Sequence, residues 1–365
     1  MKIPFFFSQR EHKHLKKKII SSISKSLIHG KTLQGPEVSN LELKLAKYIG
    51  TKYAIAVGSC TDALFFSLKA INIKEGDEVI VTSYSYLASA TCILRCGAVP
   101  VFVDVNENGN MDLNQIKKKF TSKTRAIIYV HLFGYQENIS KLVKFIKKKN
   151  IYLIEDFAQA FGAKYKNSHA GSFGDISCTS FDPTKVLSAP GSGGMAFTNN
   201  KFLRDRIVKL RYHGKNKGGE NDSLGINSQL PTLTAATLLV KFKLLEKNKK
   251  IRINIAKFYF DRLKNLKIKL PPVTDNQSHI YHKFVIQCKR RNHLMKYLEK
   301  NGVETMIHYK KSIKDLSIFK KYKTLTPVAD LLSKQSISLP IHPYLKKKEL
   351  NYIVSKIKYF FDKNY

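Results

Sequence analysis

Short apolar runs of the buried-strand type alternate with helical patterns between residues 53 and 198, and this alternation constrains the fold more than any other feature. The runs that we interpret as strands cover 53–57, 78–82, 99–105, 125–132, 151–155, 176–181 and 195–198. Helical patterns lie between them at 63–70, 88–96 and 138–149. Such a rhythm is typical of a mainly parallel sheet covered by helices on both faces, so the sequence predicts an α/β fold.

The pattern of residues in the last third of the chain predicts a smaller lobe. Pro231 opens a predicted helix over 232–247, and a second helix is predicted over 251–263. Pro271 and Pro272 interrupt the pattern, and we expect a strand and two further helices beyond them, at 281–287, 292–301 and 347–361. We therefore predict a large domain over 1–247 and a small C-terminal α/β domain over 248–365, with an N-terminal helix as a candidate to pack on the small lobe.

Charge is the most unusual feature of the composition, because 64 Lys and Arg face 27 Asp and Glu, for a net charge of +37. The lysines form short clusters scattered along the chain, so we interpret them as a general bias and expect no specific nucleic-acid partner. No apolar run reaches the roughly 18 residues of a membrane span. The apolar stretch at 3–7 is too short for a signal peptide, so a cytoplasmic location is predicted. A catalytically silent basic protein that binds polyanions stays open as an alternative.

The five cysteines do not indicate a disulfide framework or a metal site. Their number is odd and no paired His or Cys cluster stands near Cys92 and Cys96. We expect buried free thiols and no metal.

One lysine stands out because of its neighbours. Lys185 follows a predicted strand and precedes the glycine-rich turn 190–194. A lysine in such a place can lose its proton through desolvation and act as an amine nucleophile. Another predicted strand ends in Asp156, one helical turn before Gln159. Lysine, acid and amide together are the set that pyridoxal phosphate (PLP) enzymes require, although Asp156 alone is equally well explained as a helix cap.

Residues that suit the rest of such a cofactor also follow strands. The turn 58–62 leads into a helix, whose first N–H groups attract anions. Backbone N–H groups of Ser59, Cys60 and Thr61, with the Thr61 hydroxyl, are predicted to hold a phosphate, and Ser180 is a further phosphate ligand. We expect Asp156 to pair with the pyridine nitrogen, Gln159 with the phenolic oxygen, and Tyr86 to stack on the ring. Ligands of α/β proteins bind at such strand ends.

At this point the chain resembles the DegT/StrS-type PLP-dependent sugar aminotransferases over nearly its whole length. The matching residues are Gly30, Gly35–Pro36, Thr61–Leu64, Val130–Gly134, Glu155–Asp156, Ser180–Phe181, Lys185, Gly225–Ser228, Ala235–Ala236, His308–Tyr309 and Ser338–Pro340. The resemblance implies a fold-type-I homodimer with active sites at the subunit interface. It also implies that Lys185 carries PLP, that Asp156 contacts the ring nitrogen and that Ser180 and Thr61 contact the phosphate. Asn227 is implied to reach the phosphate in the neighbouring subunit.

Within this family the chain is most similar to enzymes that aminate the 3-keto form of UDP-N-acetylglucosaminuronic acid. Sugar-nucleotide contacts in that group match Gly30, Thr184, His308 and Tyr309. Thr32 and Gln229 also fall at substrate positions, but they stand where an aromatic residue and an arginine are usual. Ser192 stands where an acidic residue is common. Losing an arginine removes a bidentate anion clamp, so the sequence leaves open how this chain would hold a uronic acid carboxylate or a phosphate.

The reaction implied by the resemblance is transfer of an amino group from L-glutamate to a keto group of a nucleotide-linked sugar. The amino sugar would serve surface polysaccharide, lipopolysaccharide or glycan synthesis. Relatives that act as dehydratases carry histidine at the position of Lys185, so the lysine favours transamination. A PLP-dependent sugar dehydratase and a sulfur-transfer enzyme remain alternatives; no cysteine lies in a recognisable mobile-loop motif, which speaks against the latter.

Overall fold

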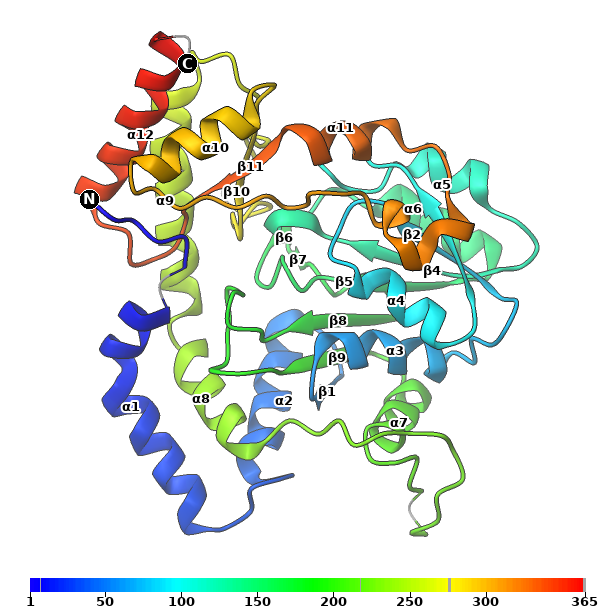
Figure 1. Cartoon of the computed structure of the whole chain (residues 1–365). Coiled ribbons are helices and arrows are strands. Elements are labelled where there is room, and N and C mark those ends of the chain that lie inside the picture. Colours follow the sequence, from blue (N-terminus) through cyan, green and yellow to red (C-terminus); the bar gives the residue numbers. More distant parts are fainter. Residues whose placement is uncertain (7, 217, 275–276, 364–365) are drawn as a thin grey trace.

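A computed structural model describes residues 1–6, 8–216, 218–274 and 277–363. A seven-stranded sheet with the order β1-β9-β8-β5-β4-β2-β3 forms the centre of the larger part (Figure 1). Its strands are β1 (Tyr53–Val57), β2 (Glu78–Thr82), β3 (Val99–Val103), β4 (Thr124–Val130), β5 (Tyr152–Asp156), β8 (Ile176–Ser180) and β9 (Gly194–Thr198). The pairs from β3 to β8 are parallel, which confirms the predicted mainly parallel α/β sheet. Only β9 runs antiparallel to its neighbours β8 and β1, because the chain folds straight back after β8.

Helices cover both faces of the sheet, as the side-chain alternation of β9 shows. Met195 and Phe197 pack in a core with α2 and α8, whereas Ala196 packs in the opposite core with α3 and α7. The helices around the sheet are α2 (Pro36–Ile49), α3 (Cys60–Ala70), α4 (Ala88–Arg95), α5 (Leu113–Lys119), α6 (Ser140–Lys149), α7 (Lys201–Leu210) and α8 (Thr232–Phe242).

A second core lies around an antiparallel pair of short strands. It is formed by β10 (Phe284–Gln287), β11 (Ser336–Leu339), α9 (Leu245–Leu263), α10 (Arg291–Lys300) and α12 (Lys347–Asp362). Helix α9 joins the two cores: Leu245 packs under the sheet, whereas Tyr259 and Leu263 pack in the second core. The predicted domain boundary at 247/248 falls inside this helix, and we keep the two-domain division as a proposal.

The shorter elements complete the described structure. They are the small strands β6 (Lys164–Tyr165) and β7 (Ser168–His169), the 3₁₀ helices η1 (Leu132–Gly134), η2 (Ile313–Asp315) and η3 (Ser317–Tyr322), and the helices α1 (Ser8–Ile28) and α11 (Pro327–Gln335). Helix α1 packs along α8, and Arg10 near its start forms a two-point ion pair with Glu349 of α12, at 3.0 and 2.7 Å. The N-terminal helix thus contacts elements of both cores.

The helices on either side of residue 244 and the strand before residue 287 have other bounds than predicted, for reasons outside the local sequence. The helix predicted over 232–247 ends at Phe242, and the next one begins at Leu245 rather than at Ile251. Apolar spacing continues through this break, which contains neither Gly nor Pro, so periodicity alone cannot reveal it. The strand predicted over 281–287 begins only at Phe284, because the backbone before it bonds to the η1 segment instead, through Lys283 N–H and the Phe133 carbonyl.

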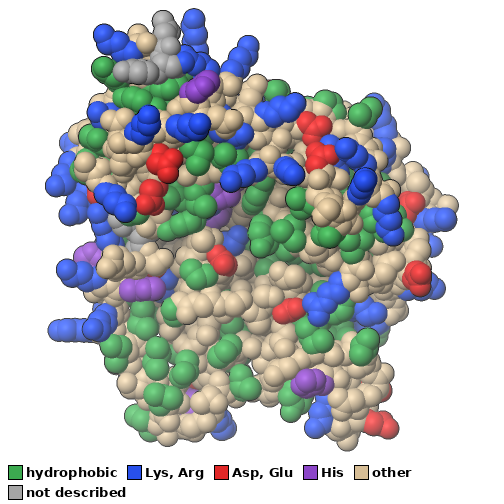
Figure 2. All heavy atoms as spheres, in the orientation of Figure 1, with side chains coloured by type: hydrophobic (Ala, Val, Ile, Leu, Met, Phe, Trp, Pro, Cys, Tyr) green, Lys and Arg blue, Asp and Glu red, His purple; other side chains and the backbone are tan. Residues whose placement is uncertain are grey.

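Lysine and arginine side chains are spread widely over the face shown in Figure 2 and are densest in its upper half, rather than gathered in one groove. The described helices include none with the length and hydropathy needed to cross a membrane. All five cysteines are free, and four of them are buried. Within the described ranges, no three His, Cys, Asp or Glu side chains come together in a way that suits a metal ion.

Candidate active site

The predicted site residues on β1, β5 and β8 meet because these strands point the same way. Asp156 ends β5, Ser180 ends β8, and α3 begins just after β1, so all three lie at the carboxyl edge of the sheet. A cavity of about 430 Å³ opens there. Its lining includes eleven of the predicted residues: Ser59, Cys60, Thr61, Tyr86, Asp156, Gln159, Ser180, Thr184, Lys185, His308 and Tyr309.

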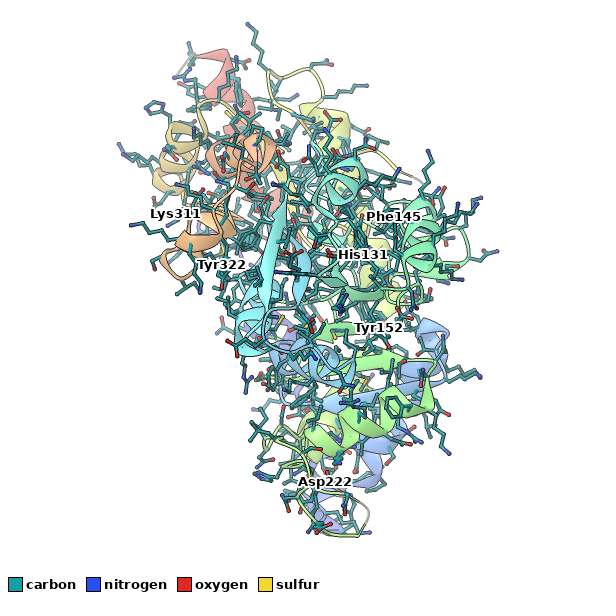
Figure 3. All side chains as sticks on the ribbon, turned by 90° about the vertical axis from the view of Figure 1, so that its right-hand side faces the viewer. His131, Phe145, Tyr152, Asp222, Lys311 and Tyr322 are labelled. Atoms are coloured by element: carbon teal, nitrogen blue, oxygen red, sulfur yellow. The ribbon has the colours of Figure 1, made fainter. Side chains whose placement is uncertain are left out.

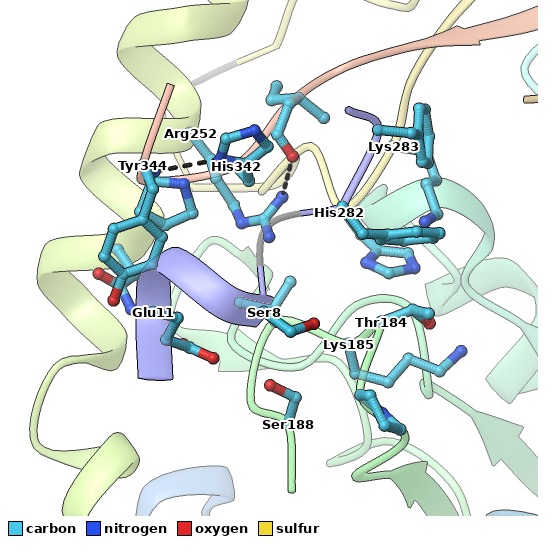
Figure 4. A pocket seen from close by; sticks show the side chains of 17 residues that line it. Ser8, Glu11, Thr184, Lys185, Ser188, Arg252, His282, Lys283, His342 and Tyr344 are labelled. Atoms are coloured by element: carbon cyan, nitrogen blue, oxygen red, sulfur yellow. Dashed lines mark hydrogen bonds between the residues drawn. The ribbon is translucent and has the colours of Figure 1, made fainter. Parts of the chain in front are cut away.

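A tight loop between β8 and β9 carries Lys185 into this cavity. The loop is closed at its base by hydrogen bonds from Phe181 N–H to the Gly193 carbonyl (2.8 Å) and from Ala189 N–H to the Phe181 carbonyl (2.7 Å). A turn in which Lys185 N–H donates to the Asp182 carbonyl (2.9 Å) sets the direction of the lysine. Figure 4 shows Thr184 and the half-buried Lys185 on this loop, beside a smaller neighbouring cavity that both residues also line.

Asp156 is a buried carboxylate with defined partners, and only 6% of its surface is exposed. Oδ2 accepts a hydrogen bond from the Ser89 hydroxyl (2.7 Å), and Oδ1 accepts one from Ala158 N–H (3.2 Å). Burial raises the pKa of Asp156, whereas these two bonds and the charge of Lys185 lower it. The carboxylate thus lies in a dry environment and close enough to the lysine to feel its charge.

Hydrogen bonds fix the part of the cavity wall that His308 and Tyr309 form. Gln159 Nε2 donates to the Tyr309 hydroxyl (3.0 Å), and the Tyr84 hydroxyl donates to the His308 carbonyl (2.6 Å). His308 Nδ1 lies 2.8 Å from the Ser338 hydroxyl. Burial, followed by the nearby lysines, lowers the pKa of His308 to about 3, so its ring is neutral at ordinary pH.

The start of α3 suits an anion. Ser59 caps the helix by accepting from Asp62 N–H (3.1 Å), while the side chain of Thr61 lines the cavity. The earliest N–H groups of a helix lack intrahelical acceptors and carry a partial positive charge. Gly194 permits the close approach of β9, since a Cβ there would lie 2.3 Å from the Ser59 carbonyl carbon and 2.4 Å from Cys60 N.

Four predicted residues lie outside this cavity: Gly30, Thr32, Asn227 and Gln229. They belong to two neighbouring segments, because Thr232 N–H donates to the Thr32 carbonyl (2.9 Å). The Gln229 carboxamide accepts from Gln34 Nε2 (2.5 Å) and donates to Asn227 Oδ1 (3.3 Å). Asn227 itself is exposed to solvent. Within one chain, these residues therefore do not reach Lys185.

Sequence reasoning missed several residues of the cavity wall, chiefly Phe6, Ser85, His282, Lys283 and Met306. It also missed Ser89, the partner of Asp156. Ser85 and Ser89 flank the predicted Tyr86, so the position after β2 was a usable signal. Phe6 comes from the N-terminal stretch that we considered only as a possible leader, and the segment before β10 carried no motif.

Behind the cavity, a fully buried pair supports the end of β5. His131 Nε2 lies 2.8 Å from Glu155 Oε2, and His131 is labelled among the strands in Figure 3. Glu155 also accepts from the N–H groups of Gly171, Phe173 and Gly174, at 2.9, 2.7 and 2.6 Å. These bonds explain an acid next to Asp156 that has no contact with the cavity.

Comparison with known proteins gives consistent matches over the full chain. The model of the DegT/DnrJ/EryC1/StrS aminotransferase family matches residues 13–358. The chain is 36% identical to dTDP-3-amino-3,6-dideoxy-alpha-D-galactopyranose transaminase of Aneurinibacillus thermoaerophilus, covering 97% of this chain and 98% of that one. It is 34% identical to UDP-2-acetamido-2-deoxy-3-oxo-D-glucuronate aminotransferase of Pseudomonas aeruginosa, covering 97% and 99%. The structure of S. venezuelae DesV in complex with a ketimine intermediate superposes with a TM-score of 0.95 at 29% identity, covering 99% of both chains. The chain therefore belongs to the DegT/DnrJ/EryC1/StrS aminotransferase family.

Proposed function

We propose that this protein transfers the amino group of L-glutamate to the keto group of a nucleotide-linked sugar. Membership of the family makes it a PLP-dependent sugar aminotransferase; the donor, the acceptor and the roles of single residues are our proposal. The observation that carries it is the meeting of Lys185, Asp156 and the start of α3 in one cavity at the carboxyl edge of the sheet.

The residues present fit the cofactor. Lys185 Nζ offers an amine for the aldehyde, Asp156 offers a buried carboxylate for the ring nitrogen, and the start of α3 with Thr61 and Ser180 offers donors for the phosphate. Gln159 and Tyr86 line the space between these groups. When bound, PLP supplies an electron sink that stabilises negative charge on the substrate carbon bonded to the amino group.

The chain itself then has to move one proton and hold two substrates in turn. Lys185 Nζ, when not bonded to the cofactor, would take the proton from the donor carbon and pass it to the cofactor carbon in the first half of the reaction, which releases 2-oxoglutarate. In the second half it would move a proton from the cofactor carbon to the former keto carbon of the sugar. The neutral His308 ring and Tyr309, fixed by its bond to Gln159, hold the sugar nucleotide together with Thr184. The carboxylate of Asp156 would favour the protonated, positively charged form of the ring nitrogen.

A 3-keto sugar is the acceptor that we favour. The two relatives described above bear names that place the amino or keto group at carbon 3, one on a dTDP-sugar and one on a UDP-sugar. The product would enter surface polysaccharide, lipopolysaccharide or glycan synthesis.

A homodimer completes the proposal. Gly30, Thr32, Asn227 and Gln229 lie outside their own chain's cavity, which fits a role in the cavity of a second subunit. Large apolar side chains are exposed near them: Ile20, Leu27, Ile28 and Leu33 are 51%, 55%, 85% and 46% exposed. An exposed apolar surface of this kind is common at subunit contacts.

Replacing Lys185 tests the function directly. We expect K185A to lose at least about 1,000-fold in amination rate, because both the covalent attachment and the proton transfer depend on Nζ. The visible absorbance of lysine-bound PLP, which hydroxylamine discharges, should vanish as well. The assay would supply glutamate with 3-keto and 4-keto nucleotide sugars and identify the products by mass spectrometry.

The exposed variant K311M is the control, since Lys311 lies outside the cavity. Near-normal amination by K185A would refute the proposal. A wild-type product that has lost water instead of gaining an amino group would replace it with the dehydratase alternative.

A further inference from the structure

Lys283 is a buried lysine that the roles proposed above do not use. Only 5% of its surface is exposed, and it lines the active-site cavity. Its Nζ lies over the rings of Phe5 (5.0 Å) and Phe6 (4.6 Å). Among the described residues, no hydrogen-bond acceptor and no carboxylate pairs with this Nζ. The two rings attract a cation, but they do not replace the hydrogen bonds and the counterion that a buried ammonium group loses, so its position calls for an explanation.

The backbone holds Lys283 in place by contacts on both sides of it. Its N–H donates to the Phe133 carbonyl (3.2 Å), and Ile280 N–H donates to the Gly134 carbonyl (3.0 Å). Gly134 is needed here, because a Cβ at that residue would lie 2.8 Å from His282 N. Strand β10 begins with the next residue, Phe284. The lysine is therefore mounted on a fixed segment and not on a mobile loop.

Two cations act on Lys283, because the charges of Lys185 and Arg252 lower its pKa, whereas Asp182 is the acid whose charge raises it. His282 and His308 feel the charge of Lys283 in turn, but burial and that charge lower the pKa of both rings, so they are neutral at ordinary pH. Asp182 is exposed, and its Oδ1 already accepts from the N–H and the hydroxyl of Thr184, at 2.9 and 2.6 Å. Arg252 Nη1 is held by the Ile341 carbonyl (2.8 Å). His282 is 3% exposed and its Nδ1 has no hydrogen-bond partner. Glu11 is the acid whose charge reaches Arg252, but its Oε2 already pairs with Lys241 Nζ (2.6 Å). Among the described residues, the cations around Lys283 therefore lack a carboxylate that is not engaged elsewhere.

Figure 4 draws a second, smaller cavity beside the active-site cavity, with His282 and Lys283 above the loop that carries Thr184 and Lys185. These four residues and Arg252 line this second cavity. An anion at this point would lie next to the amine that acts on the substrate, and away from the start of α3, which we assign to the cofactor phosphate.

We propose that Lys283, assisted by His282, binds a substrate carboxylate beside Lys185. This inference rests on the proposed function, in which two substrates can supply such a group: the amino-acid donor carries one on its reacting carbon, and a uronic acid sugar carries one on its ring. Lys283 would thus supply a cation for the carboxylate in a chain where Gln229 replaces the arginine that is usual in the family.

Binding is expected to be coupled to proton uptake. Burial and the charges of Lys185 and Arg252 lower the pKa of Lys283 to about 7. A carboxylate that accepts a bond from Nζ favours the charged form and raises this pKa again. Above pH 7, wild-type protein should therefore take up a proton when the ligand binds.

The test measures binding to the PLP-loaded protein by titration calorimetry, without turnover. The probes are 2-oxoglutarate for the donor, and UDP-glucuronic acid against UDP-glucose, which differ only in the carboxylate. We expect K283M to weaken carboxylate binding at least about tenfold, K283R to restore part of it, and K311M to leave it unchanged. Titrations at pH 8 in buffers of different ionisation enthalpy should show more proton uptake in wild type than in K283M.

Each outcome decides between the sources or against the idea. Loss confined to 2-oxoglutarate assigns the site to the amino donor, whereas loss of the preference for UDP-glucuronic acid assigns it to the sugar. Unchanged affinities in a folded K283M, checked by its circular dichroism and thermal unfolding, would overturn the inference while leaving the proposed function intact. Wild-type protein that binds none of the probes would contradict both.

Discussion

The hydroxyl group of Ser89 influences the pKa of Asp156, and through it the pH dependence that we expect for the reaction. Its bond to Asp156 Oδ2 (2.7 Å) lowers the pKa of a carboxyl group that burial raises. In S89A that pKa must rise, so Asp156 takes up its proton at a higher pH than in wild type. Only the carboxylate form can balance a positive ring nitrogen. We therefore expect the acidic limb of the kcat profile to shift to higher pH, with little change at alkaline pH.

The measurement is kcat against pH under saturating substrates. S177A is a matched control, because Ser177 is equally buried but donates to the Gly171 carbonyl (2.6 Å) outside the cavity. A profile of S89A that overlays wild type would show that the protonation of Asp156 does not limit the reaction.

At the residue scale, the local sequence could predict Lys185 and Asp156, because Asp156 ends a buried strand, Lys185 lies in the loop after another, and strand ends gather at one edge of the sheet. Lys283 could not be predicted in this way. It is one of 64 Lys and Arg residues, and its burial depends on contacts with Phe133 and Gly134, about 150 residues earlier in the chain. Contacts between such distant segments cannot be inferred from the residues that neighbour Lys283 in the sequence.

At the scale of elements, β9 and the start of α3 depend on a residue without a side chain. In G194A the new Cβ would press against Ser59 and Cys60, so either β9 or the helix start must move. We expect a loss of about 1–3 kcal/mol in the free energy of unfolding and weaker PLP binding, because the helix start is the proposed phosphate site. Thermal unfolding and a spectroscopic PLP titration would measure the two effects.

G218A serves as a control for this prediction. Gly218 is exposed, and a Cβ there would meet only the end of the Asn216 side chain, at 3.3 Å. Wild-type PLP affinity in G194A would show that the helix start does not hold the phosphate.

Elements were predictable where hydrophobic period and burial agree, as in β4 and β5. The end of α8 and the start of α9 could not be predicted, because the apolar spacing continues across the break between them. Lys241 near the end of α8 is buried against Glu11 of α1, with Nζ and Oε2 2.6 Å apart, and Leu245 is buried under the sheet. Both contacts join segments that are distant in the sequence. They lie on either side of the break between α8 and α9, where the sequence has neither Gly nor Pro.

At the scale of the whole molecule, the proposed dimer makes a quantitative prediction. K185A and N227A should each be inactive alone if Asn227 serves the neighbouring subunit. When the two are unfolded and refolded together, one site of each mixed dimer contains both intact residues. We expect about one quarter of wild-type activity, since half the dimers are mixed and each has one working site.

Light scattering on a sizing column would establish the dimer, and the activity of the mixture would test the shared site. Refolding each variant by itself is the control for recovery. A mixture as inactive as its components would argue against a contribution of Asn227 across the interface. The family resemblance implied sites for Gly30, Thr32, Asn227 and Gln229, but the local sequence could not show that they lie outside their own chain's cavity.

Helix α9 has a mechanical consequence. It runs without interruption from the core under the sheet to the second core, with Arg252 along its length. A hinge needs residues that can change their φ and ψ angles freely, and each such change inside a helix breaks backbone hydrogen bonds. This connection therefore acts as a strut. It resists rotation of the two cores relative to each other, so the walls of the cavity keep nearly the same spacing before and after a bulky substrate binds.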